Sequence, residues 1–314
     1  MRYYFPILAV LLMAFSCRQQ SKKQDTLSLM PQNGTQIKSG ETVKVVLQHI
    51  DSSFDSIQYY LDTLKLATRT DSSAVELATE TCALGSRLLT ARLFSGGTQM
   101  QELSSNIELV SSRVPDQYSF EIVNKYAHDT SSYTEGLEFI DGGFYESDGE
   151  YGASSIRKTT LQGKVSQLKN FDAKYFAEGI TVIGDQVLML TYKERVMLLL
   201  DKNTFEVKKT LPYNHAAEGW GLTNDGHTIY NTDGSNRIFK LNKDTFRPEG
   251  YLEVYDDKGP VESLNELEWI DGKLYANIYT SDLIAIIDPL TGAVEGYANL
   301  LGIRKDDVID DTQD

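Results

Sequence analysis

Short runs of alternating hydrophobic and polar residues occur along the chain from residue 26 onward. Between residues 26 and 112 the runs at 42–47, 57–61 and 88–93 alternate in this way, and glycine-containing turns separate such runs. Alternation puts every second side chain on one face of a strand. Strands at a spacing of roughly ten residues are typical of a β-sandwich. We therefore predict an immunoglobulin-like sandwich over residues 26–112.

After residue 118 the pattern becomes a repeat. Four segments share an opening glutamate, a glycine turn, an aromatic or aliphatic strand, a third strand with a turn, and a fourth strand. The opening residues lie 43, 40 and 48 residues apart and are Glu135, Glu178, Glu218 and Glu266. Four short strands on this period are typical of a β-propeller blade, whereas a β-helix repeats on a shorter period. The prediction is an all-β chain with a propeller over residues 118–314.

The innermost strand of each blade lines the central channel, so equivalent positions should converge there. We expect the four opening glutamates to form a ring of carboxylates at one mouth of the channel. Their expected aromatic neighbours are Tyr133, Phe176, Trp220 and Trp269. Carboxylates this close cannot all ionise cheaply, so at least one pKa should rise toward neutrality and supply a general acid or base. Two alternatives stay open: glutamate-glycine is repeated strand-entry chemistry, or the oxygens hold a structural calcium.

Composition adds charge to this picture. The 314 residues suggest two domains, and 41% hydrophobic with 24% charged residues excludes wholesale disorder. Asp and Glu number 45 against 30 Lys and Arg, a formal net charge of −15. This charge makes nucleic acid an unexpected partner and favours cationic groups such as the amino end of a peptide. The two cysteines, Cys17 and Cys82, cannot form a disulfide framework.

The first 17 residues resemble a bacterial lipoprotein signal. Arg2 precedes an apolar run at residues 5–15, which is shorter than the roughly 20 residues that span a bilayer as a helix. The run stops just before Cys17, and a polar stretch, residues 18–25, follows. We expect Cys17 to be lipidated, residues 18–25 to act as a tether, and the protein to be anchored to a bacterial membrane on its periplasmic or cell-surface side. An ordinary secretory signal with an incidental cysteine is the alternative.

Six ordered stretches carry a more specific likeness. They are Tyr133-Thr134-Glu135-Gly136-Leu137, Tyr145-Glu146-Ser147 with residues 151–158, Tyr175-Phe176-Ala177-Glu178-Gly179-Ile180, Thr191-Tyr192-Lys193-Glu194, Glu218-Gly219-Trp220-Gly221-Leu222-Thr223 and Leu264-Asn265-Glu266-Leu267-Glu268-Trp269. In order and spacing, residues 120–303 resemble the plant and bacterial type of glutaminyl-peptide cyclotransferase, a five-bladed propeller. The resemblance implies that the α-amine of an N-terminal glutamine attacks its own side-chain amide, which gives pyroglutamate and ammonia.

The same resemblance implies roles for single residues. Glu178 would carry the proton from the amine to the leaving amide, while Trp220 and Asn265 match positions that donate hydrogen bonds to the substrate carbonyl. The remaining residues implied to bind substrate are Tyr133, Glu135, Phe176, Tyr192 and Tyr279. The implied partners are peptides or proteins with N-terminal glutamine, and no cofactor is implied.

The chain also departs from the family pattern. Tyr133 and Glu135 stand where the family usually has phenylalanine and glutamine, and an ionised carboxylate cannot donate a hydrogen bond. Tyr192 and Tyr279 replace two tryptophans but keep an aromatic wall. The family has a further blade, with a site lysine, that nothing beyond Gly302 matches. The pattern therefore predicts about four blades, an open sheet edge and a sequence fragment rather than a natural four-bladed enzyme.

Two other functions remain open at this point. A non-catalytic cell-surface propeller that binds peptide N-termini or glycans would account for Glu135, the added sandwich and the unmatched end. A metal-dependent, lactonase-like propeller is the other, although only four histidines occur in the chain and carboxylates alone would have to bind the metal.

Overall fold

The structure, a computed structural model, describes residues 26–50 and 53–304. The predicted lipoprotein signal with Cys17 and the predicted tether at residues 18–25 lie outside the described residues, as does the acidic end of the chain. Every regular element within the described ranges is a β-strand. No helix there is long and apolar enough to cross a membrane.

Two sheets form the N-terminal unit. Its strands are β1 (Ser28–Met30), β2 (Thr35–Lys38), β3 (Thr42–Gln48), β4 (Ser56–Leu61), β5 (Leu64–Arg69), β6 (Val75–Ala78), β7 (Gly85–Ser95) and β8 (Thr98–Val110). One sheet has the order β1-β3-β6 and the other β2-β8-β7-β4-β5. Alternate side chains of these strands, such as Leu47, Ile57 and Leu89, are buried in one shared apolar cluster. This unit is called the sandwich below.

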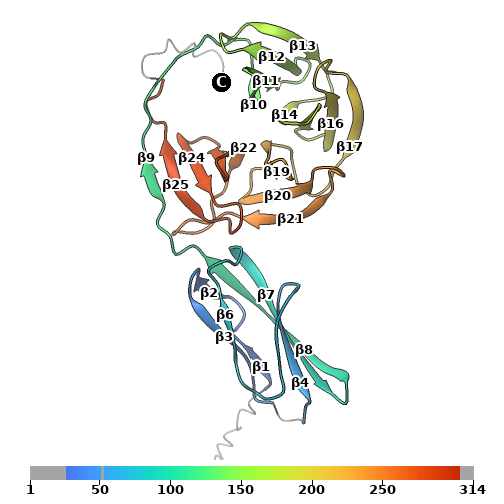
Figure 1. The fold of residues 1–314 in the computed structure, drawn as a ribbon, viewed down its shortest axis with the longest axis vertical. Helices are drawn as coiled ribbons and strands as arrows, with labels where there is room; N and C mark the ends of the chain where they lie inside the picture. The colour runs from blue at the N-terminus through green and yellow to red at the C-terminus, as the bar shows by residue number, and fades with distance from the viewer. Residues whose placement is uncertain (1–25, 51–52, 305–314) are drawn as a thin grey trace, which may run out of the picture.

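Four antiparallel sheets follow, and Figure 1 shows them side by side around an axis. The first comprises β10 (Thr134–Ile140), β11 (Gly143–Asp148), β12 (Ser155–Thr160) and β13 (Val165–Asn170), and the second β14 (Ala177–Ile183), β15 (Gln186–Thr191), β16 (Val196–Asp201) and β17 (Val207–Pro212). The third comprises β18 (Leu222–Asn224), β19 (Thr228–Thr232), β20 (Arg237–Asn242) and β21 (Pro248–Glu253), and the fourth β22 (Leu264–Ile270), β23 (Lys273–Ile278), β24 (Leu283–Ile287) and β25 (Val294–Asn299). In each sheet these four strands pair in sequence order, as in a propeller blade. The prediction of an all-β propeller is confirmed.

The second blade shows why these sheets stack. Its middle strands β15 and β16 are almost continuous apolar runs, as expected for strands buried on both faces. Met189 and Leu198 pack into the cluster shared with the first blade, whereas Leu188 and Leu199 pack into the cluster shared with the third. The outermost strand β17 is mostly exposed. Burial between neighbouring blades therefore accounts for most of the propeller's apolar core.

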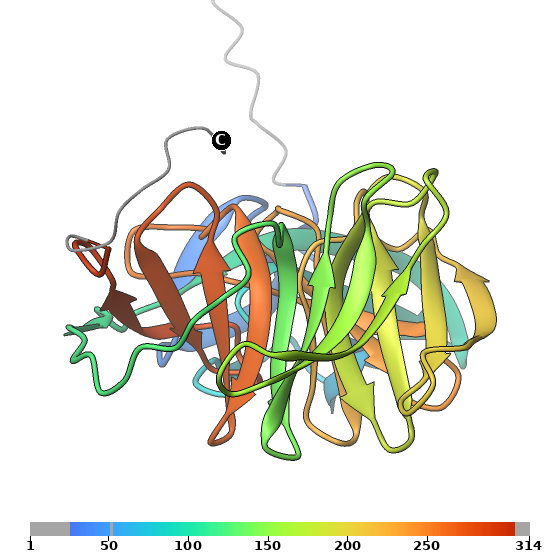
Figure 2. The ribbon, with the colours of Figure 1, turned by 90° about the horizontal axis from the view of Figure 1, so that it is seen from above.

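The innermost strands contact one another in succession around the axis, and β10 also contacts β22. Figure 2 shows β10 in green beside β22 in orange. The repeated glycine makes this approach possible. A Cβ on Gly179 would lie 2.4 Å from the Trp220 carbonyl oxygen, and one on Gly136 would lie 2.7 Å from the Ile180 nitrogen. The glycine of the repeat is thus a packing requirement, independent of the glutamate before it.

The region between the fourth and first blades differs from the other blade junctions. β9 (Asp116–Tyr118) pairs in parallel with β25, so the predicted open edge of the fourth blade is covered over three residues. Residues 119–133 contain no strand. On this side Leu137 and Phe139 of β10 are exposed, whereas the corresponding strand β14 is buried over almost its whole length.

The sandwich and the propeller are joined by specific contacts. The Ser86 amide donates to Glu253 Oε2 at 2.9 Å, and the Leu84 amide donates to the Thr291 carbonyl at 2.8 Å. Tyr255, which belongs to the propeller sequence, packs into the sandwich core and donates its hydroxyl to Glu108 at 3.3 Å. These contacts link the rim of the third and fourth blades to one end of the sandwich.

Candidate active site

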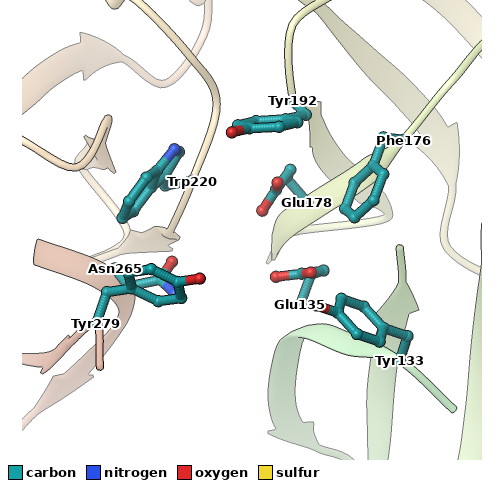
Figure 3. A pocket seen from close by; sticks show the side chains of 8 residues that line it. All are labelled: Tyr133, Glu135, Phe176, Glu178, Tyr192, Trp220, Asn265 and Tyr279. Atoms are coloured by element: carbon teal, nitrogen blue, oxygen red, sulfur yellow. The ribbon is translucent and has the colours of Figure 1, made fainter. Parts of the chain in front are cut away.

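One cavity at the propeller axis gathers all eight residues that the sequence singled out for substrate binding and catalysis. Figure 3 shows the two carboxyl groups facing each other on one side and an asparagine on the other, with aromatic rings around them. The lining residues are Tyr133, Glu135, Phe176, Glu178, Tyr192, Trp220, Asn265 and Tyr279. They come from all four blades, although they span almost 150 residues of sequence.

Shifts in strand register occur at three polar residues that line the cavity, Glu135, Glu178 and Asn265. The pairing of β10 with β11 shifts register at Glu135, and that of β14 with β15 shifts across Glu178. The pairing of β22 with β23 shifts across Asn265 in the same way. A β-bulge bends the strand and turns one side chain out of the regular alternation. The same local device thus directs three polar side chains from three blades toward the axis.

Phe176 is the centre of one aromatic wall. Its ring meets Tyr133 edge-on at 6.2 Å, Tyr151 at 5.4 Å and Tyr192 at 5.6 Å between ring centroids. Gly149 lets this wall form, because a Cβ there would lie 2.4 Å from Phe176 and 3.0 Å from Glu135 Cγ. The rings therefore exclude water from one side of the carboxyl groups.

Two residues that contact this aromatic wall, Tyr151 and Glu194, were given no role by the sequence analysis. Tyr151 donates its hydroxyl to Glu194 Oε1 at 2.8 Å, and the Phe176 amide approaches Glu194 Oε2 at 3.4 Å. Both residues lie in stretches that the sequence analysis quoted only for their family likeness. The sequence offered one signal for these two residues. Tyr151 follows the hairpin of β10 and β11, and Glu194 follows the equivalent hairpin of β14 and β15 in the next blade.

The opposite wall consists of Trp220 and Tyr279, whose rings meet edge-on at 5.5 Å. The Trp220 indole N–H donates to Glu218 Oε2 at 3.1 Å. This N–H is therefore engaged within the protein, and the expected hydrogen bond to a substrate carbonyl stays a prediction. Asn265, on the same side of the cavity, presents a side-chain amide to the space between the walls.

Glu135 and Glu178 form a hydrogen-bonded carboxyl pair. Burial raises the pKa of both groups, and the neighbouring charges of Glu135, Glu218 and Glu194 raise the pKa of Glu178 further. Glu178 is only 6% exposed. Two carboxylates cannot hydrogen-bond to each other without a proton, so the pair carries one.

The expected ring of four glutamates is incomplete. Glu135 and Glu178 line the cavity, whereas Glu218, which accepts from the Trp220 indole, and Glu266 are not among the lining residues. The reason is the alignment of the repeat: Trp220 and Asn265, rather than Glu218 and Glu266, occupy the positions equivalent to the two paired glutamates. Glu218 lies two residues before Trp220, and Glu266 lies one residue after Asn265. The expected aromatic neighbour Trp269 is also elsewhere, since it stacks on Tyr230 at 5.7 Å.

Further carboxyl groups lie half-buried on the innermost strands β10 and β22, outside the cavity lining. Burial raises the pKa of Glu266 well above its ordinary value, and its Oε2 has no hydrogen-bond partner within the described residues. Burial likewise raises the pKa of Glu138 and of Glu268 to about 7. The sequence analysis gave no role to Glu138 or Glu268, although residues 266 and 268 lie on one face of a strand by alternation.

These groups do not form a metal site. Within residues 26–50 and 53–304, no three His, Cys, Asp or Glu side chains are placed so that they could hold an ion together. The calcium alternative therefore has no ligand set in the part of the chain that the structure describes. What the cavity offers instead is a shared proton, an amide hydrogen-bonding group and a largely aromatic lining.

Comparison with known proteins gives a consistent result. A family model described as glutamine cyclotransferase matches residues 92–314. A glutaminyl-peptide cyclotransferase of Arabidopsis thaliana is 33% identical over 189 residues, which are 59% of this chain and 58% of that protein. The chain thus spans less than two thirds of the length of this curated relative. A crystal structure of Myxococcus xanthus glutaminyl cyclase matches with a TM-score of 0.55 and 30% identity, over 59% of this chain and 78% of that one.

Proposed function

The chain belongs to the glutamine cyclotransferase family, and on that premise we propose that it converts the N-terminal glutamine of peptides or proteins to pyroglutamate with release of ammonia. The observation that carries the proposal is the Glu135–Glu178 carboxyl pair, which faces Asn265 across an aromatic cavity. Cyclisation needs one proton removed from the amine and one supplied to the leaving nitrogen. A carboxyl pair that holds a single proton meets both needs.

The cavity also suits the substrate's amino end. Free α-amino groups have a pKa of about 7.7–8.0, so much of the substrate carries a positive charge near neutrality. Aromatic faces such as Phe176 and Tyr192 attract cations, and Glu218 and Glu194 add negative potential at the edge of the site. The acidic chain therefore concentrates the substrate's amino group where it must react.

The reaction itself is an intramolecular attack. As the amine attacks the side-chain amide carbon, negative charge develops on the amide oxygen. We assign the donor to this oxygen to the Asn265 side-chain amide, which faces the carboxyl pair across the cavity. Glu178 is the group that delivers a proton to the leaving nitrogen. General acid-base transfer of this kind contributes about 10²–10⁴-fold, and holding the amine against the amide contributes through proximity.

Ammonia release from glutamine-initiated dipeptides tests the proposal. The full chain should release one ammonia per dipeptide consumed, and Glu178→Gln, which keeps the shape of the side chain, should lower kcat by about 10²–10⁴-fold. Thermal unfolding measured in parallel establishes that each protein is folded. A folded wild-type chain without turnover would contradict the proposal, and calorimetric binding of the dipeptide in that case would support the non-catalytic propeller instead.

A further inference from the structure

The cavity contains one carboxyl more than a single proton shuttle needs. Resting on the proposed function, we propose that Glu135 is the catalytic base of this chain and Glu178 its catalytic acid, and that the proton returns across the hydrogen bond between them. The substrate class is unchanged, but the proton path runs through two residues. The division of labour follows from where the two side chains lie.

Both carboxyl groups have access to the same substrate. Glu135 lies on the bulge of β10 and Glu178 on the bulge of β14, two inner strands that contact each other. Their side chains face each other on one side of the cavity. Glu135 is also held from behind, since its Cγ packs over Gly149, where a Cβ would lie 3.0 Å away.

The surroundings decide which member of the pair holds the proton. The charges that face Glu178 come from four residues on four different segments, Glu135, Glu194, Glu218 and Glu266. The charges near Glu135 are those of Glu178 and Glu150, and Glu135 is less buried than Glu178. Negative neighbours and burial both disfavour ionisation, so the proton resides on Glu178 and Glu135 is the carboxylate.

Other titratable groups near the pair do not change this assignment. Burial and nearby carboxylates raise the pKa values of the hydroxyls of Tyr133, Tyr151 and Tyr213, so these groups stay neutral. The Lys193 ammonium is more than half exposed and lies 3.8 Å from Glu218 Oε1. It therefore offsets Glu218 at the rim rather than either member of the pair.

A neutral Glu178 cannot accept the first proton, and this is why the second carboxyl matters. The free α-amine attacks the side-chain amide carbon, the new C–N bond forms, and the carbonyl π electrons move to oxygen. The attacking nitrogen, now positively charged, gives one proton to Glu135. Glu178 gives its proton to the leaving nitrogen as the old C–N bond breaks and the carbonyl reforms. Ammonia leaves, and the proton on Glu135 passes to Glu178, which restores both groups.

Environments that push two carboxyl groups apart in pKa commonly mark an acid and a base. Burial raises the pKa of Glu135 to about 7, and the pKa of Glu178 is raised further. Glu135 must be ionised, so kcat should rise with pH around neutrality. Glu178 must be protonated, so kcat should fall again at higher pH. Because the two groups interact, the apparent pKa values of the rising and falling limbs of the kcat–pH profile describe the Glu135–Glu178 pair rather than either residue alone.

The test compares Glu135→Gln, Glu135→Asp and wild type as full chains with glutamine-initiated dipeptides between pH 5 and 9. Glu135→Gln should lower kcat by about 10²–10³-fold, because an amide cannot accept the proton. It should also remove the contribution of Glu135 to the acid limb, which leaves only the ionisation of the substrate's α-amine. Glu135→Asp keeps the carboxylate and should retain at least about tenfold more activity than the glutamine variant. Glu76→Gln, which removes an exposed carboxylate of the sandwich, should leave the profile unchanged.

The outcomes separate this inference from the proposed function. An active wild type with a Glu135→Gln variant of equal kcat would overturn the base assignment and leave the cyclotransferase function intact. Equal losses in the aspartate and glutamine variants would also overturn it, since they would indicate a packing role. A folded but inactive wild type would instead contradict the proposed function. The double variant with Glu178→Gln should be no worse than either single variant, because residues that act as a unit are not additive.

Discussion

The sandwich and the propeller are both built from short β-strands, but they differ in the kinds of side chain that they bury. The sandwich core is an apolar cluster, and carboxylates such as Glu76 and Glu102 lie on its exposed side. The propeller buries apolar clusters between its blades and, in addition, holds buried or half-buried carboxyl groups along its axis, such as Glu178 and Glu266. Burying an ionisable group is unfavourable unless it is neutralised or paired.

This difference in buried groups indicates that different residues of the chain serve stability and function. The blades already have apolar faces to pack against each other, so the axial carboxyl groups are not needed to hold the blades together. They are a cost to the folded state, and two of them, Glu135 and Glu178, line the cavity. The described residues of the sandwich include no buried carboxyl group of this kind.

Two matched substitutions, one in the sandwich core and one in the cavity, should test this division between stability and function with the largest effects. Leu89→Ala in the fully buried sandwich core should lower the free energy of unfolding by about 2–5 kcal/mol and leave kcat unchanged. Glu178→Gln should do the reverse, because it removes the ionisable group but keeps its volume: activity falls and stability is kept or rises. Urea denaturation and the dipeptide assay on both variants measure the two effects. A large loss of stability in Glu178→Gln would show that the axial carboxyl groups are structural.

The pH dependence of stability should sharpen the comparison. Burial raises the pKa of Glu138 and Glu268 from 4.5 to about 7, so the folded propeller binds protons that the unfolded chain has released. Their contribution to stability is fully present below about pH 4.5 and is lost as pH rises to about 7. One pKa unit corresponds to about 1.4 kcal/mol, so each group should remove roughly 2 kcal/mol after allowance for solvent screening.

Urea denaturation at pH 5, 6, 7 and 8 measures this loss. Glu138→Gln and Glu268→Gln should each flatten the curve, whereas Glu76→Gln in the sandwich should not. His215 acts in the opposite direction, because burial lowers its pKa and its folded form binds fewer protons. The difference between wild type and each glutamate variant cancels that contribution. Parallel curves for wild type and both propeller variants would contradict the prediction.

The two regions also differ in how far the sequence predicts them. The 40- to 48-residue repeat predicts the propeller because each blade is one packing unit. The same repeat predicts the cavity at Glu135 and Glu178, since equivalent inner positions converge. It fails at Glu218 and Glu266, because the positions equivalent to Glu135 and Glu178 in the third and fourth blades are those of Trp220 and Asn265. Alternation alone does not reveal a bulge, and neither the Trp220–Glu218 bond nor the Trp269–Tyr230 stack has a sequence signal.

The smallest predicted effect concerns the joint between the two regions. Gly85 has a φ of +90°, and a Cβ there would lie 1.9 Å from the Glu253 carboxylate that accepts the Ser86 amide. Gly85→Ala should therefore strain the backbone and displace Glu253, with a loss of about 1 kcal/mol.

The informative measurement for Gly85→Ala is whether the sandwich and the propeller unfold in one transition or two, rather than the total free energy of unfolding. If the joint transmits stability between the sandwich and the propeller, wild type should unfold in one transition, and Gly85→Ala should separate the transitions of the two regions. Glu253→Gln, which weakens the same hydrogen bond without backbone strain, should shift them in the same direction by a smaller amount. Since the cavity lies at the axis and the joint at the rim, kcat should not change in either variant. A change in kcat would mean that the sandwich influences the site through the rim, and the separation of stability from function would then be incomplete.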